Sequence, residues 1–493
     1  MHHYPSMFSH PKEDSVAGVV VFLVALPLCL GIAIACGVPP VSGLVAGVVG
    51  GIVVPWISRS PLSVTGPAAG LTSIVLAEVS KIGLDGFLMG VVVGGVLQFL
   101  MGVIRAGRFS ALVPSAVIKG MLAAIGITIV WRQLPVAFGA AGGVFDIPGQ
   151  LHPSAAFIAV LSLVMLYGWK YTPLARYPLI SPALVVVVTA SVVAEALRGS
   201  GLALAGGHYV DVPLGGIQAL GSALPRPDFS MMMNPAVWIT GATIAVVASI
   251  ETLLSVQAVD RLDPLKRHSP PDRELLAQGT ANAVSGLLGG LPVTAVIVRS
   301  GANVAAGARE RLSTLVHGVL LLVAVVFAGQ LLNQIPMACL AAVLIQVGLN
   351  LCKPALFATQ VRLGLTQLLP FGVTIAAVLA LDLLKGVIVG IVIGVGFVVY
   401  ENSKRAVLAE RDADGVWQMR FRRDGTFVSK PGIVSTLEEV DDGERVVIDG
   451  TGEYIDHDVK EVLATFVQDA RHRNISVTLV GIDMSHAHAG GGH

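Results

Sequence analysis

Charged residues are scarce in this chain. Only 13% of its 493 residues are Asp, Glu, Lys or Arg, whereas hydrophobic residues make up 54%. Soluble proteins carry about 25% charged residues, so the composition argues against an ordinary soluble enzyme. The high apolar content also excludes a disordered chain. We therefore expect an α-helical membrane protein that crosses the bilayer several times.

The chain also has few aromatic residues, few cysteines and no net charge. Aromatic residues make up 6% of the chain, while glycine contributes 56 residues, which suits helices that pack closely in lipid. The 32 basic residues balance the 32 acidic ones, so nothing predicts a nucleic-acid partner. The four cysteines, Cys29, Cys36, Cys339 and Cys352, lie in or beside apolar runs without a CxxC pair or metal-site spacing. We interpret them as small packing residues.

The few charges are distributed unevenly along the chain. Residues 1–402 contain 21 basic and 16 acidic residues, whereas residues 403–493 contain 11 and 16. Two regions of such different charge density are expected to lie in different solvents. We predict a cytoplasmic N-terminal segment at 1–15, a transmembrane domain at 16–402 and a small soluble domain at 403–493.

Apolar runs predict fourteen spans in the transmembrane domain. They lie at 16–36, 41–57, 67–79, 86–104, 113–131, 155–170, 180–197, 236–254, 274–289, 294–303, 312–332, 337–349, 366–384 and 386–401. An even number of spans places both termini on one side of the membrane. Cytoplasmic termini put 13 basic residues in inner loops and 5 in outer ones, as the positive-inside rule favours. We therefore expect both termini in the cytoplasm.

Two of these runs, 67–79 and 294–303, are too short to cross a hydrocarbon core of about 30 Å. Each follows an extended stretch rich in Pro, Thr and Gly, at 60–67 and at 289–294. The short runs are the third and the tenth, so they are seven spans apart, and an odd number reverses the orientation. This pattern predicts two inverted repeats, 16–198 and 236–402, as in secondary transporters. The extended stretches must be buried in protein or line a cavity.

Two half-helices that begin near the membrane midplane predict an anion site. The N-terminus of a helix presents free N–H groups and about half a positive charge. The candidate ligands are the amides of Ala68, Ala69, Gly70, Ala295, Val296 and Ile297, with the hydroxyls of Thr72 and Thr294. The alternative is that the Gly and Pro residues only kink the helices for packing.

Ionisable residues inside the expected spans are further candidates, because each is costly in lipid. Arg299 could provide positive potential for the anion or pair with a helix C-terminus. Glu251 and Ser255 share a helix face at i and i+4, and could hold Na⁺ or a proton. Thr294 is a third candidate for this coupling site. Alternatively, Glu251 caps its helix or extends its carboxylate to the cytoplasmic surface.

A second polar face lies on the ninth span. Glu274, Gln278 and Asn282 recur there at intervals of four residues, so they share one helix face. We expect this face to pack against the eighth span rather than bind substrate.

The soluble tail has the pattern of a βαβ unit. Residues 445–450 and 475–480 predict buried strands, and 458–473 predict an amphipathic helix between them. Two earlier strands are expected at 416–421 and 426–433, paired about a turn.

The whole chain resembles the SulP family, or solute carrier family 26. The matching pieces are Ala25-Leu-Pro27, Ser63-Val-Thr-Gly-Pro67, Ser249-Ile-Glu-Thr-Leu-Leu254, Leu291-Pro-Val-Thr294 and Arg299-Ser-Gly-Ala-Asn303. The tail is similar to a STAS domain through Val447-Ile-Asp449 and Tyr454-Ile-Asp456. It departs from that pattern at Asp456-His-Asp458, which lacks the serine that some STAS domains phosphorylate.

The resemblance implies a fold, an activity and site residues. It implies fourteen spans divided into core and gate domains, and a homodimer that transports anions by an elevator motion. The family's acid and hydroxyl of the eighth span fall on Glu251 and Ser255, and its third-span threonine on Thr72. Its tenth-span backbone donors fall on 295–297, and its arginine on Arg299. Val298 departs from the family, which often has a small or hydroxylic residue there.

The first span resembles that of bacterial members linked to bicarbonate and carbonic anhydrase. We therefore expect a Na⁺- or H⁺-coupled bicarbonate symporter of the bacterial inner membrane, with carbonic anhydrase as a candidate partner. The alternatives are a sulfate or dicarboxylate symporter, a chloride/bicarbonate exchanger and a channel. No enzyme is expected, because the chain shows no nucleophile–base pair, zinc triad or phosphate loop. No cofactor is expected beyond the coupling ion.

Overall fold

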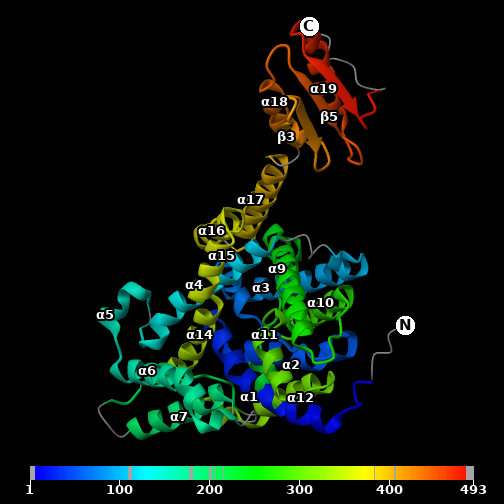
Figure 1. Ribbon diagram of the computed structural model, residues 1–493. Helices are drawn as coiled ribbons and strands as arrows, with labels where there is room; N and C mark the ends of the chain where they lie inside the picture. Colours follow the sequence, from blue (N-terminus) through cyan, green and yellow to red (C-terminus); the bar gives the residue numbers. More distant parts are fainter. Residues whose placement is uncertain are drawn as a thin grey trace. The chain divides into compact units, whose positions relative to one another are not determined.

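The structure is a computed structural model of the full chain (Figure 1). It describes residues 6–108, 114–140, 142–176, 181–198, 202–204, 206–214, 216–381, 383–404 and 407–484. Parts of the expected N-terminal segment and soluble tail, residues 1–5 and 485–493, lie outside the described residues. The chain divides into two compact units. The first comprises Met1–Arg362 with Phe371–Val389, and the second comprises Leu363–Pro370 with Gly390–His493.

Helices of 9–32 residues dominate the first unit. They are α1 (Pro11–Ala35), α2 (Pro40–Ile57), α3 (Thr72–Val103), α4 (Ser115–Ala137), α6 (Pro153–Gly168), α7 (Pro182–Leu197), α9 (Pro235–Leu262), α10 (Pro271–Leu287), α11 (Ile297–Ala305), α12 (Leu312–Phe327), α14 (Met337–Leu351) and α15 (Pro354–Arg362). Two further helices, α16 (Leu365–Ala380) and α17 (Leu383–Lys404), contribute residues to both units. Several helices begin with proline in the first turn, where its missing N–H costs nothing and its fixed φ suits the helix.

Within the described residues, seven helices are long and apolar enough to cross a membrane. Four more apolar helices have 10–17 residues. The protein therefore has the helical architecture of a membrane protein, while the total of fourteen spans stays a prediction. The expected spans 67–79 and 86–104 fall on one element, α3, which breaks at Gly83 (φ 73°, ψ 170°). The eighth span is longer than expected, because α9 continues to Leu262.

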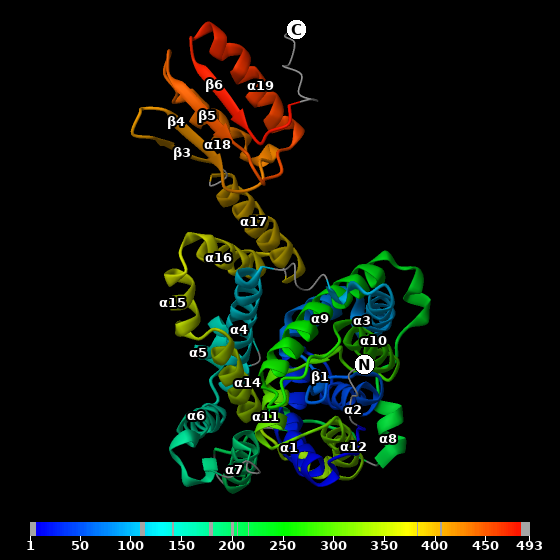
Figure 2. The same cartoon turned by 45° about the vertical axis from the view of Figure 1, so that its right-hand side comes forward.

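The helices of the first unit form two groups. The first helix group contains α1, α2, α3, α9, α10, α11 and α12, with α3 packed along α10 and α9, and α1 along α12. The second helix group contains α4, α6, α7 and α14, with α4 packed along α14 (Figure 2).

Glycines allow close helix contacts within each group. Gly95 of α3 faces Gly279 of α10, and Gly126 of α4 faces Gly348 of α14. A Cβ at Gly95 would lie 2.7 Å from the Gly279 carbonyl oxygen, and one at Gly348 would lie 2.7 Å from that of Gly126. The high glycine content therefore has a structural role at these crossings, where small residues bring the backbones together.

Two three-residue strands pair at the centre of the first helix group. Strand β1 (Thr65–Pro67) runs antiparallel to β2 (Val293–Ala295), with Gly66 opposite Thr294. All six residues are buried. The expectation that the two extended stretches are buried in protein is therefore confirmed. Their pairing satisfies backbone groups that lipid would leave without partners. We call this pair the ribbon.

The second unit contains a four-stranded sheet in the order β3-β4-β5-β6. Its elements are β3 (Val407–Arg411), β4 (Trp417–Phe421), α18 (Lys430–Glu438), β5 (Arg445–Asp449), α19 (His457–His472) and β6 (Ser476–Val480). Strands β3 and β4 are antiparallel, and the other neighbours are parallel. The βαβ unit made by β5, α19 and β6 agrees with the sequence pattern.

The strand expected at 426–433 is wrong. Residues Phe427–Ser429 form a 3₁₀ turn that leads into α18. Thr426 and Ser429 make a capping box, and a proline occupies the first turn of α18, where it suits a helix but would break a strand ladder. The antiparallel partner of β4 is instead β3, which the sequence pattern did not predict.

Replacing Gly95 with alanine should destabilise the protein. The new methyl group would press against the α10 backbone, and overpacking of this kind costs about 1–3 kcal/mol. Thermal unfolding of the purified protein measures the loss. Gly372→Ala is the matched control, because a Cβ there meets no atom within 4 Å. Equal melting temperatures for the two variants would contradict a tight α3–α10 contact.

Candidate functional site

A cavity of about 540 Å³ lies in the first unit. One wall is α9, two half-helix N-termini form the second, and α4 and α14 of the second helix group form the third. The lining residues are Ala69, Gly70, Ile118, Met121, Leu122, Ile125, Glu251, Leu254, Ser255, Gln257, Ala258, Arg261, Val296, Ile297, Val298, Gln346, Val347, Asn350 and Leu351. Most of these side chains are apolar, so the few polar groups determine what the cavity can bind.

The ribbon brings the two half-helices to the cavity. Strand β1 leads through a 3₁₀ turn (Ala69–Leu71) into α3, and β2 leads into α11. Side chains of α10 hold the ribbon in place. Gln278 donates to the Thr65 hydroxyl (2.7 Å), and the Asn282 amide makes two hydrogen bonds with the Val293 backbone (2.6 and 3.1 Å).

The polar face of α10 was expected to pack against α9. Its hydrogen bonds go instead to the ribbon, to the end of α2 and to α3. Glu274, Gln278 and Asn282 are all fully buried. Glu274 accepts a hydrogen bond from Ser58, at the end of α2, and Asn282 also donates to Gln98 of α3 (2.7 Å). The face supports the ribbon and α3, and none of its three residues lines the cavity.

The tenth-span amides are only partly free. The Ala295 N–H donates to the Thr252 hydroxyl (3.3 Å), and the Val296 N–H donates to the Val64 carbonyl (2.9 Å). These two amides therefore support the ribbon, which corrects their assignment as anion ligands. Helix α11 begins at Ile297, and its first N–H groups, including that of Ile297, have no acceptor inside the helix.

Only some of the candidate anion ligands of the third span reach the cavity. Ala69 and Gly70 line the cavity, whereas Ala68 and Thr72 are buried beside it. The Thr72 hydroxyl donates to the Ala69 carbonyl (2.8 Å), so it stabilises the turn that precedes α3. A hydroxyl engaged in this way is not aimed at a ligand in the cavity.

Glu251 is the one carboxylate among the residues that line the cavity. It sits well inside α9 rather than at its end, and its carboxylate lies against Gly70. A Cβ on Gly70 would be 2.7 and 2.8 Å from the two carboxylate oxygens. The oxygen Oε2 has no hydrogen-bond partner in the part of the chain that the structure describes. Ser255, one turn further along α9, also lines the cavity, so the structure brings this predicted pair together.

Thr294 and Arg299 do not line the cavity, contrary to the prediction from the sequence. Both are fully buried inside the first helix group. Thr294 belongs to β2, and the Arg299 guanidinium lies against Gly66 of β1. Arg299 sits near the start of α11, but its side chain turns back behind the ribbon. The sequence located Arg299 on a short helix without indicating this direction.

Four polar lining residues were missed by the sequence analysis: Gln257, Arg261, Gln346 and Asn350. Arg261 lies beyond the expected eighth span, 236–254, but α9 extends past it, and it follows Ala258, another lining residue, by about one turn. Gln346 and Asn350 come from α14, one turn apart. Their i, i+4 spacing in an apolar run is the signal that could have identified them.

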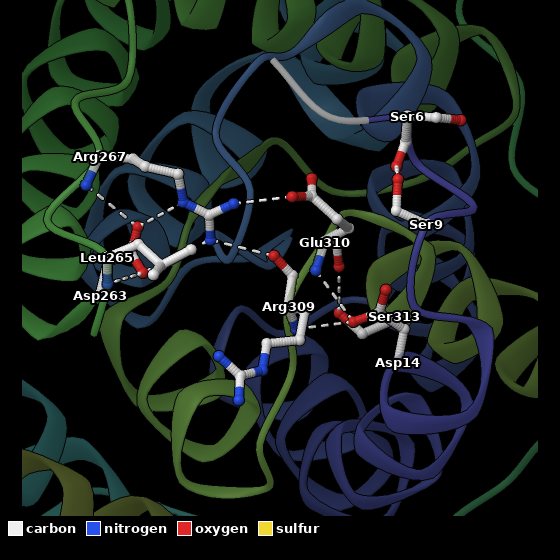
Figure 3. A network of polar contacts seen from close by, with 9 residues as sticks. All are labelled: Ser6, Ser9, Asp14, Asp263, Leu265, Arg267, Arg309, Glu310 and Ser313. Atoms are coloured by element: carbon white, nitrogen blue, oxygen red, sulfur yellow. Dashed lines mark hydrogen bonds and ion pairs between the residues drawn. The ribbon is translucent and has the colours of Figure 1, made fainter. Parts of the chain in front are cut away.

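A network of polar contacts joins the ends of α1, α9 and α11 (Figure 3). Asp14 of α1 accepts hydrogen bonds from the backbone N–H groups of Arg309 (2.7 Å) and Glu310 (2.9 Å), which follow α11. Arg267 forms ion pairs with Asp263 and Glu310, both at 2.7 Å. Burial opposes the Asp263 charge, but the bonds from Arg267 outweigh it and lower the pKa of that carboxyl. The network therefore fixes the half-helix α11 relative to α9.

Comparisons with known proteins agree on one family. A model of the sulfate permease family matches residues 12–378. The chain is 27% identical to "Putative sulfate transporter YvdB" of Bacillus subtilis (strain 168), over 96% of this chain and 91% of that protein. It is 26% identical to the bicarbonate transporter BicA of Picosynechococcus sp., over 70% of this chain and 62% of that protein.

A solved structure has the same fold. It is the murine Solute Carrier 26 family member A9 anion transporter in the inward-facing state, with a TM-score of 0.75 and 17% identity. The match covers 97% of this chain and 87% of that one.

Replacing Asp14 with alanine should destabilise the first unit. One buried and one partly buried N–H group would lose their acceptor, and an unsatisfied buried group costs about 1–3 kcal/mol. The melting temperature of the purified protein should fall by several degrees. Glu13→Ala provides the control, because Glu13 is the exposed neighbour of Asp14. An unchanged melting temperature in Asp14→Ala would show that the network does not hold these ends together.

Proposed function

Because this chain belongs to the sulfate permease family, whose members are transporters and not enzymes, we propose that it is a cation-coupled symporter of a small oxyanion. Anion transport is the activity of the family. The coupling and the identity of the anion are the parts of the proposal that need support from the cavity.

The position of Glu251 is the observation that carries the proposal. Its carboxylate shares a cavity with two half-helix N-termini, which favour an anion. A carboxylate and a bound anion repel each other in a site of low dielectric constant. Anion binding beside the Glu251 carboxylate becomes favourable once Na⁺ or a proton neutralises that carboxylate. The site therefore requires the anion and the cation to bind together, and this requirement is symport.

The cavity residues take distinct roles in this proposal. The N-terminal turns at Ala69–Gly70 and at Ile297–Val298 hold the anion through backbone N–H groups. Glu251 accepts the proton, or it binds Na⁺ together with the Ser255 hydroxyl. One carboxylate and one hydroxyl supply too few oxygens for a hard cation, so backbone carbonyls or water would complete a Na⁺ shell.

The second helix group completes the site with α4 and α14. Rigid-body motion of one group against the other would expose the cavity to each side in turn. Arg261 lies at the C-terminal end of α9, which is cytoplasmic in the orientation favoured by the loop charges. Arg261 lines the cavity at that end, where it would attract anions that approach from the cytoplasm.

Bicarbonate is the first candidate for the transported anion. The first span resembles that of bicarbonate-linked bacterial members, and the relative BicA is named as a bicarbonate transporter. Sulfate is the second candidate, because YvdB is named for sulfate and matches nearly the whole chain. Dicarboxylate symport, chloride/bicarbonate exchange and channel conduction would appear as other outcomes of the same assay.

The remaining expectations complete the proposed biological setting. The protein is a homodimer in the bacterial inner membrane, with both termini cytoplasmic and the second unit acting as a STAS domain. Such a domain could regulate transport or support dimerisation, and a carbonic anhydrase is the candidate partner for bicarbonate uptake.

Replacing Glu251 with glutamine should abolish cation coupling. Uptake of bicarbonate, sulfate and fumarate into proteoliposomes is measured with and without a Na⁺ or H⁺ gradient. The wild type should accumulate one anion only with one cation gradient, and Glu251→Gln should lose that dependence because it cannot carry the charge. Glu195→Gln, at an exposed position on α7, is the control. Gradient-dependent accumulation that survives in Glu251→Gln would refute symport through this residue.

Replacing Gly70 with alanine should reduce uptake at least about tenfold. The new methyl group would displace the Glu251 carboxylate from the anion turn, and small displacements of binding groups have effects of this size. Gly301→Ala on α11 is the matched control, because a Cβ there meets nothing within 4 Å. Initial uptake rates and half-saturating anion concentrations separate loss of binding from loss of movement. Wild-type kinetics in Gly70→Ala would place the site elsewhere.

A further inference from the structure

A smaller cavity, of about 330 Å³, lies at the C-terminal end of α9. Its lining residues are Gln257, Asp260, Arg261, Lys266 and His268. Gln257 and Arg261 also line the larger cavity that contains Glu251. The two spaces are therefore neighbours along α9, and Arg261 borders both of them. We call the smaller space the terminal pocket.

The turn after α9 brings Lys266 to the terminal pocket. The Lys266 backbone N–H donates to the Asp263 carbonyl (3.0 Å), and Lys266 has a positive φ of 50°. Residues with a side chain seldom adopt this left-handed conformation. The Lys266 ammonium donates to the Arg261 carbonyl (2.6 Å) in the last turn of α9. This bond uses one of the three N–H groups of the ammonium, so two stay available to a ligand.

The two cations of the terminal pocket are not neutralised by ion pairs. In the described part of the chain, neither Arg261 nor Lys266 forms an ion pair with a carboxylate. The next residue, Arg267, differs, because Asp263 and Glu310 both pair with it (Figure 3). Arg267 therefore belongs to the structural network, whereas Arg261 and Lys266 can bind an anion.

A carboxylate in the lining offsets part of this charge. The two oxygens of Asp260 accept hydrogen bonds from the backbone N–H (2.8 Å) and the hydroxyl (2.7 Å) of Ser269, so the carboxylate is engaged with the loop that leads to α10. With Arg261 and Lys266 positive and Asp260 negative, the lining keeps one net positive charge. Protonation of His268 would add a second.

We propose that the terminal pocket is a second binding site for the transported oxyanion, at the cytoplasmic end of the cavity. The Arg261 guanidinium, the Lys266 ammonium and the Gln257 amide donate to the oxygens of the anion. An anion held there repels a second anion in the neighbouring cavity and competes with it for Arg261. It therefore opposes release of the next anion from the cavity, so cytoplasmic anion slows its own uptake. This inference rests on the proposed transport function and adds product inhibition to it.

The two linings differ in a way that allows a selective test. Lys266 lines the terminal pocket only, whereas Arg261 lines both spaces. Lys266→Gln removes the charge from the terminal pocket, while the new amide can still donate to the Arg261 carbonyl. Lys266→Arg keeps the charge. Lys12→Gln, which removes an exposed lysine in the first turn of α1, is the matched control.

Uptake of radiolabelled sulfate and bicarbonate is measured in right-side-out bacterial membrane vesicles that contain the full chain and are loaded with increasing concentrations of the same unlabelled anion. We expect the internal anion to inhibit wild-type uptake. The half-inhibitory concentration should rise about fivefold in Lys266→Gln, as for the loss of one exposed charged contact. Lys266→Arg and Lys12→Gln should keep the wild-type value. Uptake into vesicles without internal anion should be equal in all four proteins, because the cavity is unchanged.

Three results would overturn the inference. One is wild-type uptake that does not depend on internal anion. Another is an equal half-inhibitory concentration in Lys266→Gln and the wild type, and the third is the same rise in Lys12→Gln as in Lys266→Gln. All three leave coupling through Glu251 intact, because coupling is measured as dependence on the cation gradient. A chain that accumulates no anion would refute the transport function instead.

Binding to the terminal pocket is also tested without transport. Crystals of the full chain are grown with selenate, an analogue of sulfate whose selenium gives an anomalous signal. We expect an anomalous peak between Arg261 and Lys266 in the wild type and in Lys12→Gln, and its loss in Lys266→Gln. A wild-type pocket without a peak, or a peak that persists in Lys266→Gln, would contradict the assigned site.

Discussion

The requirement that buried backbone groups find partners governs this structure. Two extended stretches enter the middle of a helical bundle, where lipid could not satisfy their N–H and C=O groups. They satisfy each other by forming the ribbon, and α10 completes the arrangement through Gln278 and Asn282. Every functional proposal depends on this pairing, because the ribbon sets where the two half-helices begin.

The pairing also separates two regions of opposite character. In front of the ribbon, helix N-termini and Glu251 face a cavity that the second helix group closes. Behind it, Arg299 is enclosed without a carboxylate partner among the described residues. Backbone N–H groups of the two half-helices therefore face the cavity, while the arginine lies on the other side of a three-residue strand.

Close helix contacts make such an arrangement rigid. Glycines at the α3–α10 and α4–α14 crossings bring backbones together within each helix group. Between the groups, the cavity is lined mainly by apolar side chains of α4 and α14. Each helix group is tightly packed, and few polar side chains face the cavity between the groups. This arrangement suits rigid-body motion of one group against the other.

The sequence by itself determined the class of protein, the positions of the two broken spans and the placement of Glu251 and Ser255 on one helix face. These follow from local patterns: apolar runs, Pro/Gly punctuation and i, i+4 spacing on one helix. Helical spacing could also have indicated Gln346 and Asn350, but nothing local shows that α14 faces the cavity.

The tertiary structure decided which predicted ligands reach the cavity. Ala295 and Val296 use their amides in the ribbon, and Arg299 turns away from the cavity toward Gly66. These outcomes depend on which backbone groups pair across more than 200 residues of sequence, and on the space left by a glycine on the opposite strand. A local pattern locates a residue on an element, whereas long-range pairing determines the direction in which its side chain and its N–H group point.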